Sequence, residues 1–439
     1  MLRHYKATLR LGFPIAVGQL GIIVTGFADT MMIGHYSTSA LAAASFVNSL
    51  FNLVNFLLIG YSYGLTPLIS RLYGQGRQRE IGQTLRNGLV CNLLFALVVL
   101  AFVTAGFFLL DKMGQPREVV PLIRSYYLPV LVSMLFVSFF STLRQFTDGV
   151  TDTAIGMWIL LIGNALNILG NYFLIYGIGF FPEWGLFGAG VSTLVSRIFM
   201  ALALPLGVIL KKRYTPCLKG LMEKSAHGTT LGQIHKTSLP VSLQMGMETG
   251  VFTVCGIMAG WIGAIDLATF QVLMTMGTLG YLLYYSFGAS MSIRVASFYG
   301  AHNVTELRKA SRAGTHILIA MTTLACLAFF FFGEAIIRLF TSDTSVIALG
   351  LALIPFLMLY QLGDAMQVCF SNALRGTTQV RSVMLTAFVS YIVINIPLGY
   401  ILAFPCNLGS AGLFLAFSAG LFTAAVLYGR AFFGVLRRM

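Results

Sequence analysis

The sequence is poor in charged residues. Aspartate, glutamate, lysine and arginine together make up 10% of its 439 residues, whereas soluble domains carry about 25%. Acidic residues are the scarcer kind, with 14 Asp and Glu against 28 Lys and Arg, while hydrophobic residues reach 57%. This is too little charge to cover the surface of a soluble fold of this length. The composition therefore predicts an integral membrane protein.

Several short motifs are also absent. The sequence contains no G-x-x-x-x-G-K-[ST], no C-x-x-C and no H-x-x-x-H. These absences exclude a P-loop ATPase and argue against a disulfide framework or a zinc site. The net charge of +14 is carried by short loops between apolar runs. This distribution is typical of membrane topology and does not indicate a nucleic-acid-binding surface.

Twelve apolar stretches are present, and each is long enough to cross a bilayer core of about 30 Å at a rise of about 1.5 Å per residue. The predicted spans are 10–34, 41–67, 84–110, 121–143, 153–177, 186–210, 234–260, 267–293, 311–333, 345–373, 381–404 and 409–434. Between them, 23 Lys and Arg fall on the side that holds the N-terminus and 4 on the opposite side. Because basic loops stay in the cytoplasm, we expect both termini there.

The two halves of the chain resemble one another. Pro14 matches Pro240 at a separation of 226 residues, and Arg144 matches Arg375 at 231. Six spans per half predict parallel repeats, an architecture that places a transporter's substrate site between the halves. We expect an all-α membrane protein of two six-helix bundles: an N-lobe at 1–210, a cytoplasmic linker at 211–233 and a C-lobe at 234–439.

Three acids lie inside apolar spans: Asp29 in the first, Glu248 in the seventh and Asp364 in the tenth. A charged side chain at this depth is costly, so its presence indicates function. A carboxylate buried without a partner tends to hold a proton, whereas a nearby cation favours its ionised form. The hypothesis that follows is an ion-coupled transporter in which Glu248 and Asp364 share a cation or a proton.

Polar residues follow one helix face in two further spans. The rows are Ser45, Asn48, Asn52 and Asn55 in the second span, and Asn164, Asn167 and Asn171 in the fifth. Each row fits either hydrogen bonds between helices or the lining of a polar cavity. For the fifth span we favour an oxygen-rich cation site near Asp29. Arg197, inside the sixth span, either reaches the interface or pairs with an acid.

Taken together, these features resemble the multidrug and toxin compound extrusion (MATE) transporters, and among them the NorM-type branch. The resemblance covers essentially the whole chain. It is carried by FADTMMIG, which ends at Gly34, by the acids of spans seven and ten, by NILGNYFLIYG at 167–177 and by YQLGDAMQ with ALRG at 360–376. It implies a MOP-type fold with V-shaped lobes related by a pseudo-two-fold axis along the membrane normal.

The resemblance also implies the residues of the sites. In the C-lobe, the coupling ion, Na⁺ or H⁺, would be held by Glu248 and Asp364 with Tyr360 and Tyr281. In the N-lobe, the site would comprise Asp29, Asn164, Asn167, Asn171 and Thr193, with Asn171 standing where some relatives have an acid. Weaker candidates for substrate contacts are Gln271, Ser49 and Asp343. No cofactor is implied.

We therefore expect a Na⁺- or H⁺-coupled multidrug antiporter, not an enzyme, in a bacterial inner membrane. It would export cationic and aromatic compounds by alternating access, as a monomer without an obligatory protein partner or nucleic acid. The runner-up is a flippase for lipid-linked oligosaccharides, which would line its cavity with several Arg or Lys. Only Arg197 lies clearly inside a predicted span. The third alternative is a membrane enzyme, but no catalytic cluster of His, Asp or Ser is apparent.

Overall fold

A computed structural model describes residues 1–112, 116–179, 181–222 and 229–439, and within these ranges the regular structure is helical. The helices are α1 (Leu2–Tyr36), α2 (Thr38–Tyr63), α3 (Leu65–Gly74), α4 (Gln78–Phe107), η1 (Leu110–Lys112), α5 (Val120–Gly149), α6 (Thr153–Tyr176), α7 (Gly185–Leu210), η2 (Lys212–Tyr214), α8 (Thr215–Met222), α9 (Leu231–Ile262), α10 (Ala264–Gly300), α11 (Val304–Arg338), α12 (Thr344–Gly376), α13 (Val380–Ala387), η3 (Phe388–Asn395), α14 (Ile396–Ala403) and α15 (Gly409–Arg438).

The described residues contain twelve helical stretches long and apolar enough to cross a membrane, one for each predicted span. Several helices are longer than predicted, because backbone hydrogen bonding continues into the charged residues that end an apolar run. Arg294 and Arg375, which the predicted spans leave outside, lie within α10 and α12. The expectation that only Arg197 lies inside a span is therefore wrong, since both helices are long and apolar enough to cross a membrane.

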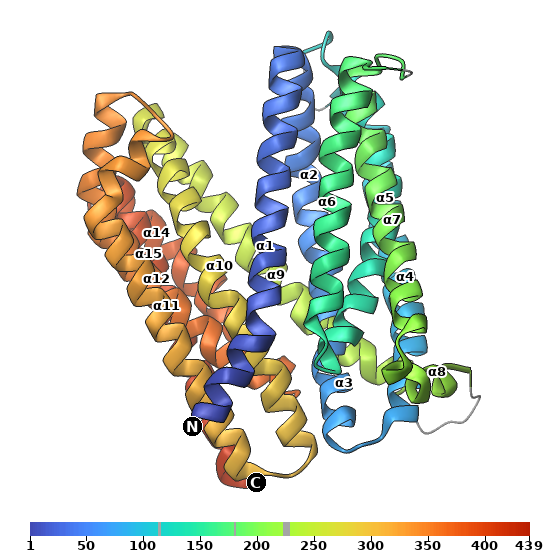
Figure 1. The fold of residues 1–439 in the computed structure, drawn as a ribbon. Helices are drawn as coiled ribbons and strands as arrows, with labels where there is room; N and C mark the ends of the chain where they lie inside the picture. Colours follow the sequence, from blue (N-terminus) through green and yellow to red (C-terminus); the bar gives the residue numbers. More distant parts are fainter. Residues whose placement is uncertain (113–115, 180, 223–228) are drawn as a thin grey trace. The chain divides into compact units, whose positions relative to one another are not determined.

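Two compact units make up the chain (Figure 1). Unit 1 consists of Met1–Ala16 and Leu243–Met439, and unit 2 of Val17–Ser242. The chain therefore changes units inside α1 and inside α9. Each change falls two residues after a proline, Pro14 or Pro240, whose missing N–H removes one helical hydrogen bond. The lobe bounds expected at 210 and 234 remain a prediction, and residues 223–228 of the predicted linker lie outside the described residues.

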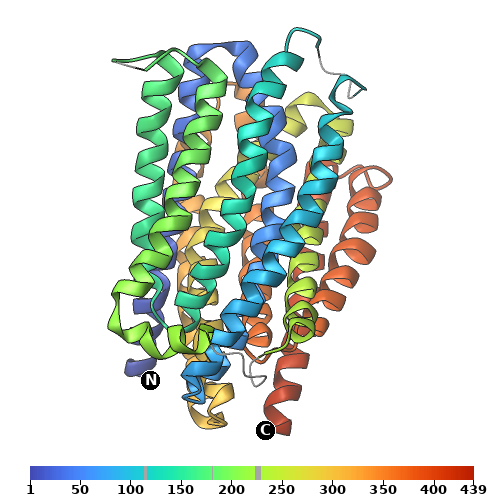
Figure 2. The same cartoon turned by 90° about the vertical axis from the view of Figure 1, so that its right-hand side faces the viewer.

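Each unit is built around its own aromatic-rich core. In unit 1, Phe414 and Phe417 of α15 pack with Tyr360 of α12, one helical turn before Asp364. In unit 2, Phe51 of α2 meets Tyr127 of α5 edge to face, with ring centroids 4.9 Å apart. Figure 2 shows the long helices of unit 2 running side by side. This packing fixes the helix faces from which the polar residues project.

The start of α1 is held in unit 1 by a buried arginine. Arg294 of α10 donates from Nη1 to the carbonyl oxygen of His4 and to Oγ1 of Thr8, each at 2.8 Å. Its Nη2 lies 2.7 Å from Nδ1 of His4. Because a guanidinium only donates, Nδ1 is the acceptor. His4 Nε2 is then free to donate to Glu306, which lies 3.0 Å away.

The start of α9 is held in unit 2 in a corresponding way. The hydroxyl of Tyr61 lies 3.0 Å from Nδ1 of His235, and Ser242 donates to the carbonyl oxygen of Leu57 at 2.8 Å. A β-carbon on Gly64 would lie 2.4 Å from Cα of Ser238, so only glycine allows this close approach. The first helix of each half thus begins in the unit built by the other half.

The backbone confirms the internal repeat at its turns. Gly76 and His302, 226 residues apart, both have φ in the left-handed region, as do Thr151 and Thr378, 227 residues apart. Relative to this second turn, Arg375 occupies the place of Asp148 and not that of Arg144. The match of Arg144 with Arg375 at 231 is therefore wrong near the ends of α5 and α12, because the helix ends themselves correspond at 227.

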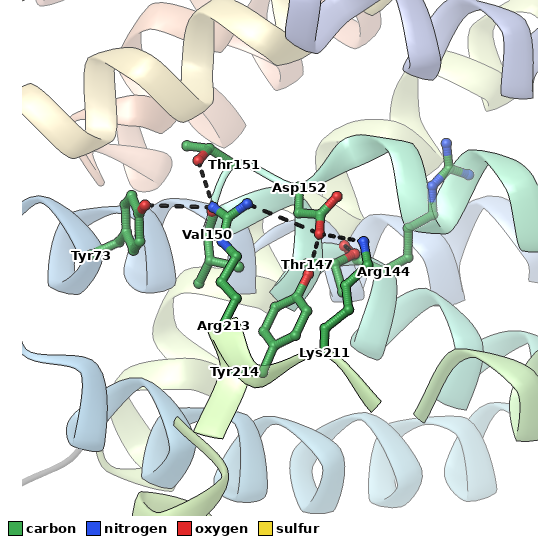
Figure 3. A network of polar contacts seen from close by, with 9 residues as sticks. All are labelled: Tyr73, Arg144, Thr147, Val150, Thr151, Asp152, Lys211, Arg213 and Tyr214. Atoms are coloured by element: carbon green, nitrogen blue, oxygen red, sulfur yellow. Dashed lines mark hydrogen bonds and ion pairs between the residues drawn. The ribbon is translucent and has the colours of Figure 1, made fainter. Parts of the chain in front are cut away.

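The chain after α7 is anchored to the α5–α6 turn through Asp152 (Figure 3). The Oδ2 atom of Asp152 accepts hydrogen bonds from Lys211 at 2.9 Å and from Tyr214 at 2.8 Å. Arg213 donates to the carbonyl oxygen of Val150 and to Oγ1 of Thr151. Burial alone would raise the pKa of Asp152, but the bonds from Lys211 and Tyr214 and the nearby Arg213 charge outweigh it and lower that pKa.

This anchor predicts a pH-dependent contribution to stability. Since the pKa of Asp152 is lowered on folding, its contribution is complete above the unfolded pKa of about 4 and is lost as the pH falls through the folded value. Asp152→Asn should lower the free energy of unfolding by about 1 kcal/mol at pH 7, a modest value because both basic partners are half-exposed. Thermal unfolding in detergent should show the difference between the two proteins shrinking as the pH falls below about 4. A difference that does not shrink on acidification would contradict this role.

The short helix α8 packs against α4 through two glycines. A β-carbon on Gly220 would lie 1.9 Å from the carbonyl oxygen of Arg79, and one on Gly82 would lie 1.9 Å from that of Cys217. The two backbones therefore touch, and no side chain fits between them. Burial raises the pKa of the thiol of Cys217, a buried residue of α8, to about 11, so the thiol is uncharged at pH 7.

Gly220→Val should lift α8 from α4 and expose Cys217. In a Cys406→Ser background, which removes the exposed thiol, we expect maleimide labelling of Cys217 to rise at least tenfold, because wild-type Cys217 is buried. Gly232→Val is the matched control, since a β-carbon there meets no atom within 4 Å. Equal labelling of the two variants would show that the close approach does not hold α8 in place.

Candidate functional site

The centre of the candidate site in unit 1 is Asp364 of α12. Its Oδ2 lies 2.5 Å from the hydroxyl of Tyr284 on α10, and that hydroxyl lies 2.8 Å from Oε1 of Gln361. Gln361 in turn donates from Nε2 to the carbonyl oxygen of Gly277 at 2.7 Å. Asp364 is 1% exposed, and Tyr284 and Gln361 are fully buried. An acid is thus built into the tight packing of α10 against α12.

Glu248 of α9 is the second acid of unit 1 and is partly buried. Its charge lies close enough to those of Asp364 and Arg375 for both to act on it. Arg375 is itself buried and donates to Oε1 of Gln244, one helical turn before Glu248, at 2.6 Å. The structure therefore brings the two predicted acids into one electrostatic environment, together with Arg375, which was not among the predicted site residues.

The two tyrosines predicted beside these acids differ in their surroundings. Tyr360 is buried against Phe252 and Phe417, close enough for the charges of both acids to act on its hydroxyl. Tyr281 stacks on Tyr285, with ring centroids 4.9 Å apart, and meets Tyr284 edge to face. The tyrosine bonded to Asp364 is Tyr284, which sequence reasoning missed although it lies one turn after Tyr281.

A further polar contact joins α12 to the π-helical segment η3. Gln367 of α12 donates from Nε2 to the hydroxyl of Tyr391 at 2.6 Å, and Tyr391 lies in η3. The charges of Glu248 and Asp364 both act on Tyr391. Single π-helical turns are frequent at functional sites. The sequence does not single out Tyr391, although Ser390 lies beside it and Asn395 one turn later in an otherwise apolar stretch.

In unit 2 the structure gathers four of the five predicted N-lobe residues. Asp29 of α1 accepts at Oδ1 from Nδ2 of Asn171 at 2.5 Å. With its amide turned to satisfy both polar atoms, Asn167 donates to the same Oδ1 at 2.9 Å and accepts from Thr193 at 3.3 Å. The nitrogens of both amides thus face the carboxylate. A cation bound here would need these amides to turn their oxygens inward.

The fifth residue, Asn164, is not joined to this group. Its Nδ2 is buried without a hydrogen-bond partner among the described residues, and it would lie 3.0 Å from a β-carbon on Gly21. Asn164 therefore lies where α6 packs closely against α1 at Gly21. The role of Asn164 as a cation ligand remains a prediction.

Arg197 of α7 lies near Asp29 without an ion pair within 4.0 Å among the described residues. Its Nη1 donates to Oγ of Ser133 at 2.6 Å. The charges of Arg197 and Asp29 both act on the buried Tyr126, which donates to Asn48 of the row in α2 at 3.2 Å. The sequence leaves two alternatives open for Arg197, reaching the membrane interface or pairing with an acid. The bond to Ser133 argues against the first, because the guanidinium points to polar groups inside unit 2.

The three candidate substrate residues lie apart from these groups. Gln271 of α10 and Ser49 of α2 are exposed in the unit to which each belongs. Asp343 caps the start of α12, where its Oδ1 accepts from the N–H groups of Ser345 and Val346. A helix cap accounts for an acid at this position without any ligand. Substrate contact at all three remains a prediction.

What the two groups offer chemically is a set of buried or partly buried acids, not a metal centre. Among the described residues there is no cluster of three or more His, Cys, Asp or Glu that could hold a metal ion. Asp364 instead faces a hydroxyl and Asp29 faces two amides, polar groups that can stabilise either a proton or a passing cation. Such a group suits reversible binding of a positive charge more than bond-breaking chemistry.

Comparison with known proteins agrees with this description. The family model described as MatE matches residues 14–173 and 240–401, one segment in each half. The Multidrug resistance protein NorM of Vibrio parahaemolyticus is 30% identical over 437 residues, which cover 98% of this chain and 96% of that protein. A protein of the same name from Photobacterium profundum is 28% identical over 97% of this chain and 94% of its own length.

Solved structures are similar in fold across the whole chain. One described as "Outward-facing conformation of a multidrug resistance MATE family transporter of the MOP superfamily" has a TM-score of 0.89 at 20% identity, covering 99% of this chain and 97% of that chain. The eukaryotic MATE transporter AtDTX14 has a TM-score of 0.88 at 19% identity, covering 100% and 98%. The predicted twelve-helix, all-α membrane fold is confirmed. With one match in each half and relatives along its whole length, the chain belongs to the MatE family of membrane transporters and is not an enzyme.

Proposed function

We propose that this protein exports cationic and aromatic drugs across the bacterial cytoplasmic membrane, in exchange for Na⁺ or H⁺. Membership of the family and the names of the NorM relatives support multidrug efflux. The observation that carries the coupling is the pair of acids in unit 1, Glu248 and Asp364, whose charges interact inside a membrane-spanning bundle. The excess of Lys and Arg on one side supports a cytoplasmic location for both termini.

The mechanism is competition for the carboxylates of unit 1. Two nearby acids in apolar surroundings cannot both stay ionised without a compensating positive charge. A drug cation, a proton or Na⁺ can each supply that charge, and whichever binds excludes the others. If the coupling ion enters from outside and the drug from the cytoplasm, binding of the ion displaces the drug outward. Arg375 limits the negative charge around Glu248, since it acts on that acid directly.

We assign a different part to Asp29. Two amide N–H groups already face its carboxylate, and the charge of Arg197 acts on it. Asp29 is therefore stabilised by groups of the protein itself, whereas Asp364 has one hydroxyl. The exchange of ions is accordingly assigned to unit 1, with Asn167, Asn171 and Thr193 supporting Asp29, and with Asn164, on the same helix as the other two asparagines, without a bond to Asp29 among the described residues. Gln271 and Ser49 are proposed as substrate contacts from their exposure, and the protein is proposed to act as a monomer.

Antiport of drugs is favoured over flipping of lipid-linked sugars. A flippase needs arginines free to hold phosphate, but Arg294 is bonded to His4 and Thr8, and Arg375 to Gln244. Arg197, which bonds Ser133, is one residue and not a basic cavity lining.

The proposal is tested by flux in sealed vesicles with purified protein. A Na⁺ gradient and a pH gradient are imposed separately, and uptake of tetraphenylphosphonium, a permanently charged organic cation, is followed. At least one gradient should drive uptake several-fold above vesicles without protein. Failure of both gradients to drive any uptake, with protein shown to be folded, would overturn coupled antiport.

A further inference from the structure

The hydroxyl of Tyr284 faces more acceptors than it can serve. It lies 2.5 Å from Oδ2 of Asp364 and 2.8 Å from Oε1 of Gln361. A tyrosine hydroxyl carries a single hydrogen. An ionised Asp364 and the Gln361 oxygen are both acceptors only, so one hydrogen would have to serve two acceptors.

The orientation of Gln361 is fixed by its other end. Its Nε2 donates to the carbonyl oxygen of Gly277 at 2.7 Å, and turning the amide would place two oxygens against one another. The side chain is fully buried and packs closely on Gly280, where a β-carbon would lie 3.0 Å from its Oε1. Gln361 therefore presents a fixed acceptor to Tyr284.

Counting hydrogens then separates the two states of Asp364. If Asp364 is ionised, Tyr284 donates to it and the buried oxygen of Gln361 is left without a donor. If Asp364 is protonated, the acid donates to Tyr284 and Tyr284 donates to Gln361, so every hydrogen has an acceptor. The 2.5 Å separation requires a hydrogen between the two oxygens. Leaving a buried acceptor unpaired is unfavourable, and the network therefore prefers the protonated acid.

The surroundings of Asp364 agree with this preference. Its second oxygen, Oδ1, is buried and accepts no hydrogen bond from the described residues, which a neutral acid tolerates better than a carboxylate. The other titratable groups whose charges act with it are Glu248 of α9, Tyr360 of α12 and Tyr391 of η3. All three carry either no charge or negative charge. The nearby cation, Arg375, acts on Glu248 and is bonded to Gln244.

We propose that Tyr284 and Gln361 are positioning residues that make Asp364 a proton site in preference to a Na⁺ site. The proton on the Oδ2 of Asp364 is the ion exchanged: as a drug cation binds, that O–H bond breaks, the proton leaves to water, and Tyr284 turns its hydrogen to the carboxylate. Na⁺ binding at Oδ2 would require this oxygen and the Tyr284 oxygen to move apart within a fully buried contact. This inference rests on the proposed coupling role of Asp364.

The test measures affinity for tetraphenylphosphonium against pH in purified full-length protein at constant ionic strength. Affinity should rise with pH in the wild type, because the cation displaces a proton. The midpoint is the pH at which half of this rise has occurred. Gln361→Leu removes the competing acceptor and should lower the midpoint by about one pH unit, a tenfold change in proton affinity. Tyr284→Phe removes the donor to the ionised acid and should raise the midpoint by a similar amount. A purely structural role would not move the midpoint in opposite directions.

Controls separate this inference from the proposed function. Gln145→Leu removes a buried glutamine of unit 2 whose partner is Thr66, and it should leave the midpoint unchanged. Asp364→Asn should abolish the pH dependence; if it does not, the coupling role of Asp364 fails. If Asp364→Asn does abolish it, but the Tyr284 and Gln361 variants shift the midpoint in the same direction or not at all, only the present inference is overturned.

A second measurement uses the wild-type protein alone and so does not depend on whether any variant folds. In weakly buffered solution, wild-type protein should release about one proton for each tetraphenylphosphonium bound, and Na⁺ should not compete at fixed pH. Binding without proton release, or competition by Na⁺ in the millimolar range, would overturn the assignment.

Discussion

Asp364→Asn and Glu248→Gln are each expected to abolish the drug resistance that this protein confers on cells. Both substitutions keep the shape of the side chain and remove the charge that a drug cation or a coupling ion must neutralise. Since the two acids act on one another, loss of either leaves a site that cannot exchange one positive charge for another. Resistance should fall to the level of cells without the protein, measured as the lowest inhibitory drug concentration.

Folding must be shown to survive these changes. The amount of protein in the membrane and its unfolding temperature should stay near the wild-type values, because the amide keeps the shape of the acid and adds no buried charge. Asp111→Asn is a suitable control, since this exposed acid pairs with Arg124 away from the site, and resistance should be retained. Resistance left intact in both the Asp364 and the Glu248 variants would reject the coupling role.

Arg294→Met is expected to release the start of α1 from unit 1. The guanidinium is buried and donates to the carbonyl oxygen of His4 and to Thr8. Hydrogen bonds from a charged group contribute about 1.5–3 kcal/mol each, and the acceptors left behind remain buried. We expect a loss of about 3 kcal/mol in the free energy of unfolding, measured by denaturant titration in detergent.

Local detachment of α1 can be observed separately from global unfolding. Hydrogen exchange of backbone amides over 4–12 should accelerate in Arg294→Met before the rest of unit 1 exchanges. Arg338→Met serves as the control, because Arg338 is exposed and pairs with Glu334 one turn away, a contact worth a few tenths of a kcal/mol. Unchanged exchange over 4–12 would mean that other contacts hold this segment.

The resemblance predicted which acids matter but not all of their partners. Glu248 and Asp364 stand out in the sequence because a carboxyl group is rare in an apolar run. Tyr284 and Gln361 do not stand out, since tyrosine and glutamine are common near the ends and faces of membrane helices. Their roles depend on α10 and α12 lying in one register, which no local pattern encodes.

For the asparagine row of α6, the sequence predicts the helix face but not the orientation of the side-chain amides. Its spacing predicts that Asn164, Asn167 and Asn171 share a helix face, and the structure places two of them against Asp29. The direction of each amide, however, follows from the donors and acceptors around it. The structure turns nitrogens toward the carboxylate, whereas an oxygen-lined cation site was expected.

The order of residues is enough to predict the class of protein, the twelve spans, the repeat and the buried acids. The class, the spans and the buried acids follow from hydrophobicity and charge along the chain, and the repeat follows from residues that recur at a fixed separation. All of these can be read from the order of residues without knowing which side chains meet. Three features required the folded chain: α1 and α9 begin in the opposite unit, Arg375 stands where Asp148 stands in the first half, and Tyr284 links Asp364 to Gln361. These depend on contacts between residues up to about 290 positions apart, whose energies are set by packing and hydrogen-bond geometry and not by local composition.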